Sequence, residues 1–267
     1  MTNDYLLSQG QADVHRLGLI NQVYGPSTEA IFRKIELEPG LRVVEIGCGS
    51  GNMTCWLAEQ VGPGGKVVGI DFNADSLEQA RQQAAARKLT NIEFQTGDIN
   101  ALALPAGTFD IAYCRCVLMH QKNPEVGLGQ MAKVVRSGGT VLCEELDLSR
   151  CIFDPPAPHM QRMMELNVAI GDHHGVPYRL GSTLNSLFQK AGFKEHKVAI
   201  FKPTILRGST KQLLTLSFQQ YAPKLLETGL ARSAEVDKIL TSARRTDADT
   251  TTLYGMPPMS QGWVRIP

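Results

Sequence analysis

The chain has 267 residues, and its 27 Lys plus Arg against 26 Asp plus Glu give a formal net charge of +1. This balance excludes the strongly basic composition of proteins that bind nucleic acid or an anionic membrane surface mainly by charge. The length suits one large α/β domain with added segments, and a chain of this size buries about three quarters of its unfolded surface.

The cysteines and the apolar runs indicate the cellular setting. Six cysteines occur and none forms a C-x-x-C motif, so we expect reduced, buried thiols and no metal site. The opening residues MTNDYLLSQG have neither the basic segment nor the apolar core of a secretory signal, and no apolar run reaches transmembrane length. The sequence predicts a cytoplasmic protein with no nucleic-acid or membrane partner.

The first 38 residues precede the first expected strand. Residues 11–23 and 27–35 are each expected to form a helix, separated by Tyr24-Gly25-Pro26. Helices at this place are not needed to complete a sheet, so we interpret residues 1–38 as a helical lid. The polar residues that could line such a lid are His15, Arg16, Asn21 and Tyr24, of which Tyr24 is the strongest candidate.

A strand, a glycine turn and a helix follow from Leu41 onward. The apolar run from Leu41 to Ile46 ends in Gly47-Cys48-Gly49-Ser50-Gly51, and a helical pattern resumes at Met53. Such a turn lets a backbone approach a nucleotide-like ligand closely. Its spacing is G-x-G-x-G, whereas a dinucleotide site more often shows G-x-G-x-x-G. Glu45 would be unfavourable beside a pyrophosphate but suits a ligand with an ammonium group.

Two more acids follow the next expected strands. The strand from Lys66 to Ile70 ends in Asp71, one strand-helix-strand unit after Glu45, where a carboxylate can accept both ribose hydroxyls. The strand at 91–95 leads to Asp98, which could accept a hydrogen bond from an adenine amino group. Acids at the ends of neighbouring parallel strands, beside a glycine turn, are more specific than the turn alone.

The remaining pattern alternates strands and helices. Strands at 109–114 and 140–146 flank a helix at 124–135, which predicts a doubly wound, mostly parallel sheet. Ser182 is expected to cap a helix that leads to a strand at 193–201. A last strand at 262–266 is expected to return antiparallel. Helical insertions are expected at about 149–181 and 205–248, where they would cover the site.

Five ordered motifs carry a family resemblance: VVEIGCGSG, GIDFN, TGDI, FDIAYCRCVLMH and RSGGTVLCEE. In order and spacing they resemble the class I S-adenosylmethionine-dependent methyltransferases, which have a seven-stranded Rossmann-like sheet. The resemblance covers roughly residues 36–148, and we expect residues 39–267 to form the methyltransferase core. It implies S-adenosylmethionine as the cofactor and transfer of its methyl group to an acceptor.

The resemblance also implies which residues hold the cofactor. Glu45 and the glycine backbone would hold the methionyl end, with Asp71 on the ribose hydroxyls. Phe72 would lie against the adenine, and the backbone at Arg115 would run beside the methionine part of the cofactor. The full predicted cofactor-binding set is Glu45, Gly47, Cys48, Gly49, Asn52, Asp71, Phe72, Asp98, Ile99 and Arg115.

Histidines dominate the candidates on the acceptor side. His120 follows the fourth strand, near where the methyl group would point, so it is the candidate catalytic base. The alternative is a structural histidine whose hydrogen bonds are satisfied within a loop. A polar-aromatic cluster with Asp172 lies in the first insertion, and adjacent histidines suit one metal poorly, which favours substrate contact. The predicted substrate-binding set is Tyr24, His120, His173, His174 and Tyr178.

The substrate class follows from a missing motif. Amino-directed DNA methyltransferases carry Asn/Asp-Pro-Pro-Tyr/Phe after the fourth strand, where this chain has Cys114-Arg115-Cys116-Val117. A covered pocket suits a small molecule more than a polymer. We therefore predict methyl transfer to an oxygen, nitrogen or carbon of a small-molecule acceptor, in a protein that could form a dimer.

Two other functions stay open. An NAD(P)-dependent oxidoreductase is disfavoured by the glycine spacing and by the lack of a Tyr-x-x-x-Lys motif. A non-catalytic module that binds S-adenosylmethionine would keep the cofactor motifs and turn over no acceptor. Pericyclic or aminopropyl chemistry from the same cofactor is a further possibility.

Overall fold

The structure, a computed structural model, describes residues 6–7 and 11–267. Its strands are β1 (Arg42–Ile46), β2 (Lys66–Asp71), β3 (Ile92–Thr96), β4 (Phe109–Arg115), β5 (Val135–Leu146), β6 (Ile152–Asp154), β7 (Lys197–Phe201), β8 (Thr204–Ile205), β9 (Leu253–Gly255) and β10 (Met259–Arg265). Its α-helices are α1 (Gln11–Lys34), α2 (Asn52–Val61), α3 (Ala74–Ala86), α4 (Pro124–Val134), α5 (Pro158–His174), α6 (Leu180–Lys190), α7 (Leu213–Glu227) and α8 (Ser233–Ala248). Two short 3-10 helices, η1 (Leu118–His120) and η2 (Ser209–Gln212), complete the described elements.

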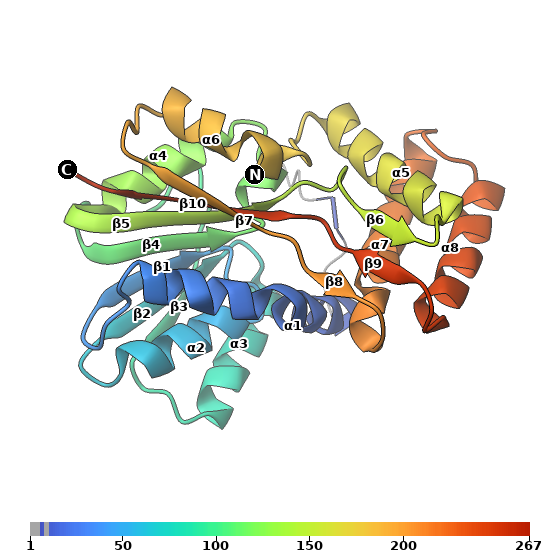
Figure 1. Cartoon of the computed structure of the whole chain (residues 1–267). Helices are drawn as coiled ribbons and strands as arrows, with labels where there is room; N and C mark the ends of the chain where they lie inside the picture. The colour runs from blue at the N-terminus through green and yellow to red at the C-terminus, as the bar shows by residue number, and fades with distance from the viewer. Residues whose placement is uncertain (1–5, 8–10) are drawn as a thin grey trace.

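A seven-stranded sheet forms the centre of the molecule, in the order β3-β2-β1-β4-β5-β10-β7 (Figure 1). The pairs from β3 to β5 are parallel, whereas β10 runs antiparallel to both β5 and β7. The predicted doubly wound, mostly parallel sheet with an antiparallel last strand is therefore confirmed. In the described ranges, no helix combines the length and the apolar character that crossing a membrane requires.

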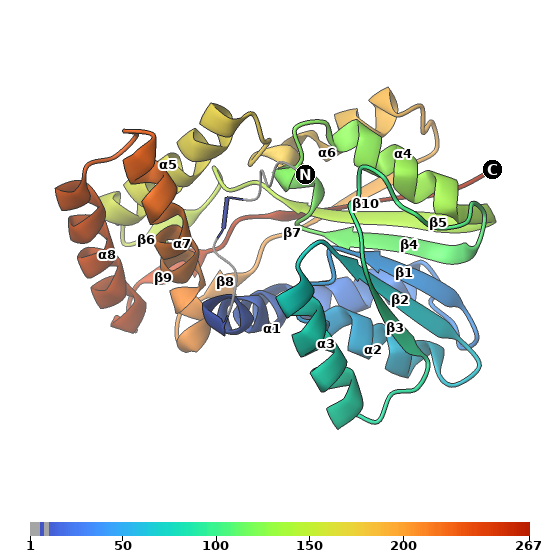
Figure 2. The same ribbon diagram turned by 180° about the vertical axis from the view of Figure 1, so that it is seen from behind.

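Helices cover both faces of this sheet, with α1, α2 and α3 on one side and α4 and α6 on the other (Figures 1 and 2). The strands supply apolar side chains to both layers because successive residues point to opposite faces. Val43 and Ile111 belong to the cluster formed with α1 and α2, whereas their neighbours Val44 and Ala112 belong to the cluster on the other side. Burial on two faces explains why the parallel strands read as unbroken apolar runs.

The segment before β1 differs from the prediction of two helices, because α1 continues through Pro26 as one helix. Proline removes one intrahelical hydrogen bond, but Pro26 itself is exposed. Next to Pro26, the Ser27 hydroxyl donates to the Tyr24 carbonyl at 2.8 Å, within the same helix. Because the helix is continuous, Ser27 lies inside it. Residues 1–5 and 8–10 of the predicted lid lie outside the described residues.

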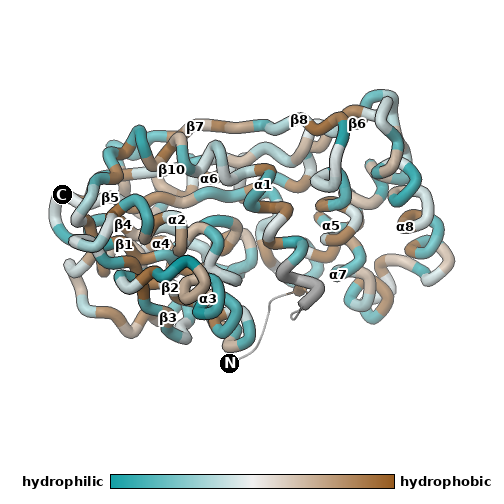
Figure 3. The backbone as a smooth tube through the Cα atoms, turned by 90° about the horizontal axis from the view of Figure 1, so that it is seen from below, coloured by the Kyte–Doolittle hydropathy of each residue, from teal (hydrophilic) through white to brown (hydrophobic). Residues whose placement is uncertain are grey.

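A second, three-stranded sheet in the order β6-β9-β8 lies beside the main one. The insertion predicted to be helical at about 149–181 also contains a strand, since β6 pairs antiparallel with β9, about 100 residues away in the chain. Helices α5, α7 and α8 pack against one another next to this small sheet. They lie together at one end of the molecule, away from β1 to β4 (Figure 3).

Four boundaries also differ from the sequence predictions, and the first is that of β7, which begins at Lys197 rather than residue 193. Strand β5 begins at Val135 rather than residue 140, with an irregularity in its pairing to β4. Strand β10 begins at Met259 rather than residue 262. Helix α6 begins at Leu180, so Ser182 lies inside it and caps no N-terminus.

Lys211 joins η2 to the segment that leads into β9. Its side chain is 1% exposed, and Nζ donates to the carbonyls of Asp249 and Thr252 at 2.5 and 2.9 Å. Nζ also lies 4.5 Å from the ring centroid of Tyr254, within the range of a cation–π contact. Burial lowers the pKa of the Lys211 ammonium group. The Lys211 cation thus joins η2 to the stretch from Asp249 to Tyr254 that leads into β9.

Replacing Lys211 by Met is expected to lower the free energy of unfolding by about 2–3 kcal/mol, because charge-assisted hydrogen bonds to buried carbonyls are lost. Denaturant-induced unfolding followed by circular dichroism measures the change. Lys202→Met is the control, since Lys202 donates to the single carbonyl of Arg150 near the surface. Equal losses in the two variants would contradict this account of Lys211.

Candidate functional site

The glycine turn after β1 packs directly against the backbone and side chains around it. The amides of Gly47 and Cys48 both donate to the Ile70 carbonyl at the end of β2, at 2.7 and 2.9 Å. Gly47 has a φ of 72°, and a Cβ built on it would lie 2.3 Å from Val117 Cγ2. Only glycine fits this position, so the turn is held against both β2 and the segment after β4.

Asp71 lies beside this turn, as the sequence predicted. Its Oδ2 accepts a hydrogen bond from the Gly49 amide at 2.8 Å, and its Oδ1 accepts one from the Asn73 amide at 2.9 Å. Asp71 is 7% exposed, whereas the adjacent Phe72 is 44% exposed. Two backbone amides thus fix the Asp71 carboxylate beside the glycine turn. The exposed ring of Phe72 is next to it in the chain.

Glu45 is oriented away from solvent and toward α2. Its side chain is 4% exposed, and Oε2 accepts a hydrogen bond from Thr54 Oγ1 at 2.6 Å. Burial raises the pKa of Glu45 to about 7, against the opposing effects of the Thr54 hydroxyl and the Arg115 charge. The acid therefore joins β1 to the helix that follows the glycine turn.

The other predicted cofactor residues surround the same edge of the sheet. Asp98 Oδ1 accepts hydrogen bonds from the backbone and side-chain nitrogens of Asn100, at 2.9 and 3.0 Å, while Ile99 is buried in the larger apolar cluster. Asn52 Nδ2 donates to Ser50 Oγ at 3.1 Å. Cys48 is buried within the turn itself. The structure brings these residues to the carboxyl ends of β1, β2 and β3.

Helix α1 covers this edge. A Cβ on Gly49 would lie 3.1 Å from Leu17 Cδ1, so α1 contacts the glycine turn. Arg115, at the end of β4, donates to Thr28 Oγ1 and to Asn21 Oδ1, both at 3.1 Å. Asn21 was a predicted lid residue, and the structure places it against a predicted cofactor residue.

Glu145 and Asp147, two of the three buried acids at the end of β5, have roles that the sequence did not reveal. Glu145 is fully buried; its Oε1 accepts from the amides of Val117 and Leu118 at 3.2 and 2.8 Å, and Oε2 accepts from the Met119 amide at 3.1 Å. Burial raises its pKa to about 8, against these amides. Glu145 therefore fixes η1, which carries His120. The only signal in the sequence was an acid pair within an apolar strand.

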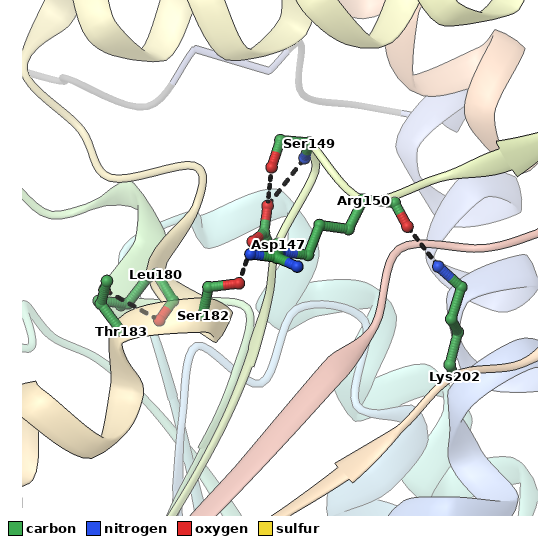
Figure 4. Close-up of polar contacts among 7 residues, drawn as sticks. All are labelled: Asp147, Ser149, Arg150, Leu180, Ser182, Thr183 and Lys202. Atoms are coloured by element: carbon green, nitrogen blue, oxygen red, sulfur yellow. Dashed lines mark hydrogen bonds and ion pairs between the residues drawn. The ribbon is translucent and has the colours of Figure 1, made fainter.

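Asp147 is the second of these acids, and Figure 4 shows its surroundings. Its Oδ1 accepts hydrogen bonds from the amide and hydroxyl of Ser149 at 2.9 and 2.5 Å, and its Oδ2 accepts from Ser182 Oγ and from Arg150 Nε. These contacts join the end of β5 to α6 and fix where the chain leaves the sheet.

A cavity of about 60 Å³ lies between α1, η1, α5 and α7. Most of its lining is apolar: Ile20 comes from α1, Met119 from η1, Met164 from α5, and Leu213 and Leu214 from α7. Two predicted acceptor-side residues, Tyr24 and His120, line it together. The polar side chains in the lining are Arg16, Tyr24, His120, Asn167, Ser217 and Tyr221.

His120 faces this cavity as a neutral, buried ring. It is 8% exposed, and its Nδ1 lies 3.2 Å from the hydroxyl of Tyr178. Burial lowers its pKa to about 3, and the charge of Arg16 adds to the effect. A general base works best with a pKa near the working pH, so this environment makes His120 a weak proton acceptor at neutral pH.

The remaining acceptor-side candidates are distributed around the cavity. Tyr24 is buried, and its hydroxyl donates to the Pro257 carbonyl at 2.9 Å. Tyr178 lies behind the lining, in contact with His120 and, at 5.6 Å between ring centroids, with Tyr221. His173 and His174 end α5 and are not part of the lining. No group of three or more potential metal ligands occurs among residues 6–7 and 11–267.

The order of the sheet and the place of the glycine turn define the class of protein. A strand order of this kind, with the turn after β1 and an acid at the end of β2, is the architecture that the class I methyltransferases share. Residues 37–194 match the family model described as a methyltransferase domain, and the chain belongs to that family. The family resemblance drawn from the motifs is therefore confirmed.

Known relatives are similar over part of their length. A demethylmenaquinone methyltransferase of Lactococcus lactis is 36% identical over 106 residues, which cover 40% of this chain and 42% of that protein. The chain spans about half the length of the curated relatives that it matches.

Solved structures share the fold at low identity. A candidate methyltransferase from Bacillus halodurans superposes with a TM-score of 0.61 at 17% identity, covering 90% of this chain and 98% of that one. Phosphoethanolamine N-methyltransferase 2 of Haemonchus contortus, in complex with S-adenosyl-L-methionine, has a TM-score of 0.61 at 15% identity, covering 94% of this chain and 57% of that one.

The lowered pKa of His120 predicts a pH dependence of stability. Between about pH 3 and the ordinary histidine value of 6.5, the folded chain binds fewer protons at this site than the unfolded chain does. The site therefore destabilises the fold progressively as pH falls through this window. Because the raised pKa values of Glu45 and Glu145 act in the opposite sense, the test compares variants rather than the wild type alone.

His120→Asn is expected to flatten the loss of unfolding free energy between pH 6.5 and pH 4, measured by urea unfolding at several pH values. The exposed His173→Asn serves as the control and should follow the wild-type profile. If His120→Asn follows it too, His120 is not a buried neutral histidine.

Proposed function

We propose that the chain transfers the methyl group of S-adenosylmethionine to a small-molecule acceptor held in the cavity between α1, η1, α5 and α7. One observation carries the proposal: the glycine turn and the cavity share their walls. Val117 contacts the turn at Gly47, and η1, which follows Val117, lines the cavity with His120. Likewise, Leu17 contacts the turn at Gly49, while its neighbour Arg16 lines the cavity.

The residues at the turn fit S-adenosylmethionine. Gly47 lets Val117 pack against the turn and so fixes its shape, and Asp71 presents a carboxylate for ribose hydroxyls beside the exposed ring of Phe72. Glu45, buried behind the turn, would favour the ammonium group of the cofactor to the extent that it is ionised, since its pKa is raised to about 7. When bound, the cofactor supplies an activated methyl group on a sulfonium centre. The task left to the protein is to align the acceptor, to exclude water and to hold the acceptor's proton where one must leave.

The apolar lining favours a lipophilic acceptor over a phosphorylated amine. The Lactococcus relative is named for demethylmenaquinone, whereas the Haemonchus neighbour is named for phosphoethanolamine. Leu and Met side chains dominate the cavity wall of this chain, which supports an acceptor of the first kind. Oxygen, nitrogen or carbon could be the methylated atom. A cytoplasmic location, a dimer and the lack of a nucleic-acid partner stay predictions.

Calorimetric titration of the purified protein with S-adenosylmethionine, S-adenosylhomocysteine and NAD tests the cofactor. Micromolar binding of the first two and none of the third is the expected result. Binding of NAD alone would overturn the proposal in favour of an oxidoreductase. Incubation with radiolabelled S-adenosylmethionine and a panel of apolar acceptors then separates an enzyme from a module that binds the cofactor without turnover.

Asp71→Ala is expected to weaken S-adenosylhomocysteine binding by about 2 kcal/mol or more, because hydrogen bonds to a charged group are worth about that much. Calorimetry measures the affinity directly. Asp75→Ala, an exposed acid in the first turn of α3, is the matched control and should bind normally. Unchanged affinity in Asp71→Ala would refute the ribose assignment.

His120→Asn is expected to slow methyl transfer by roughly ten- to a hundredfold, the size of a lost hydrogen bond to the acceptor, because the lowered pKa of His120 makes it a weak base. Its affinity for S-adenosylhomocysteine should stay at the wild-type value, because His120 lines the cavity and not the glycine turn. Single-turnover rates and calorimetry measure the two quantities. Normal turnover would remove His120 from the reaction.

A further inference from the structure

Asn167, in the middle of α5, has a buried amide oxygen without a hydrogen-bond partner among the described residues. The side chain is 2% exposed, and its Nδ2 donates to Met164 Sδ at 3.9 Å. Burying a polar atom in this state costs about 1–3 kcal/mol. Buried polar atoms in folded proteins are nearly always satisfied, so this oxygen calls for a partner.

The oxygen belongs to a side chain that lines the cavity. Two hydroxyl groups of the same lining already donate to backbone carbonyls. Ser217 Oγ donates to the Leu213 carbonyl at 2.8 Å, and the Tyr24 hydroxyl donates to the Pro257 carbonyl at 2.9 Å. A molecule held in the cavity can supply the donor that Asn167 lacks.

The charges of the lining restrict what those contents are. Arg16 lines the cavity and is 4% exposed, while no Asp or Glu occurs among the described lining residues. Among the described lining residues a cationic ligand would meet the Arg16 guanidinium and no carboxylate, which is less favourable at low dielectric than the approach of an uncharged ligand. Uncharged and anionic ligands meet no such penalty.

We propose that Asn167 binds the methyl acceptor, its side-chain oxygen accepting a hydrogen bond from a hydroxyl group on an otherwise apolar molecule that is uncharged or anionic. This assignment rests on the proposed function, since it takes the cavity as the acceptor site. It makes Asn167 the residue that selects a hydroxylated acceptor and Arg16 the residue that disfavours an amine.

Size adds a condition to the proposal. A cavity of about 150 Å³ holds a benzene ring, and this one measures about 60 Å³. An aromatic acceptor therefore enters only if the lining yields. Met119 and Met164 line the cavity, and unbranched methionine side chains rearrange at low cost. The acceptor site thus opens as it is filled.

The test measures discrimination between matched probes, with S-adenosylhomocysteine present at saturation. The probes are 4-methylphenol, 4-methylanisole, which lacks the O–H donor, and 4-methylbenzylamine, which is cationic at pH 7. Their dissociation constants are obtained by NMR titration of the full chain. Wild-type protein is expected to bind the phenol roughly three- to tenfold more tightly than the anisole, as one neutral hydrogen bond provides, and the amine more weakly than either.

Three variants isolate the role of Asn167. Asn167→Leu should bind the phenol and the anisole equally, and its melting temperature should not fall, because an unsatisfied polar atom has been removed. Asn167→Asp keeps an acceptor oxygen and should retain the preference for the phenol. Gln161→Leu, at an exposed position of the same helix, should behave as wild type.

Several outcomes would overturn the assignment. They are a wild-type protein that does not distinguish phenol from anisole, a preference that persists in Asn167→Leu, or an amine that binds as tightly as the phenol. If S-adenosylhomocysteine binds but none of the probes does, the acceptor class proposed here is wrong while the proposed cofactor stands. If S-adenosylhomocysteine does not bind, the proposed function itself fails.

Discussion

One fully buried carboxylate, Glu144, holds together the elements on which both halves of the site depend. Its Oε2 accepts hydrogen bonds from Thr28 Oγ1 and the Tyr113 hydroxyl, each at 2.7 Å, and its Oε1 accepts one from Gln261 Nε2 at 2.6 Å. These donors come from α1, β4 and β10. A buried carboxylate is tolerated only with such compensation. Through Thr28 the same network reaches Arg115, so the position of α1 over the glycine turn depends on a charge at the centre of the sheet.

The alternation of a β-strand explains how β5 serves two layers at once. Glu144 points to α1, whereas the next residue, Glu145, points to the opposite face and binds the amides at the start of η1. Two consecutive acids thus fix the helix that covers the cofactor edge and the short helix that carries His120. Buried polar networks of this kind are fully satisfied and therefore rigid. The cavity, by contrast, is lined by flexible apolar side chains, which divides the site into a preformed part and an adaptable part.

The parts of the fold that follow from local pattern could be predicted from the sequence, and the parts that follow from distant pairing could not. The glycine turn, Glu45 and Asp71 are encoded within one strand-helix-strand unit, so their positions were predicted correctly. The continuity of α1 through Pro26 was missed, because tertiary contacts outweigh the local preference of Gly-Pro for a break. Strand β6 has three residues and no periodicity of its own, and its partner lies far along the chain. Asn167 reads as one more polar residue in a helix until the cavity around it is known.

The place of β10 has a consequence for how the protein is made. This strand inserts between β5 and β7, and just before and within it Pro257 and Gln261 contact Tyr24 and Ser27 of the first helix. Until the ribosome has synthesised residue 265, β5 and β7 each present an unpaired edge. Helix α1 also lacks its hydrogen bonds to Pro257 and Gln261. Domains of other architectures begin to fold as they emerge during translation. Here the sheet closes only when β10 has emerged, so the edges of β5 and β7 must be kept from aggregation until that strand arrives.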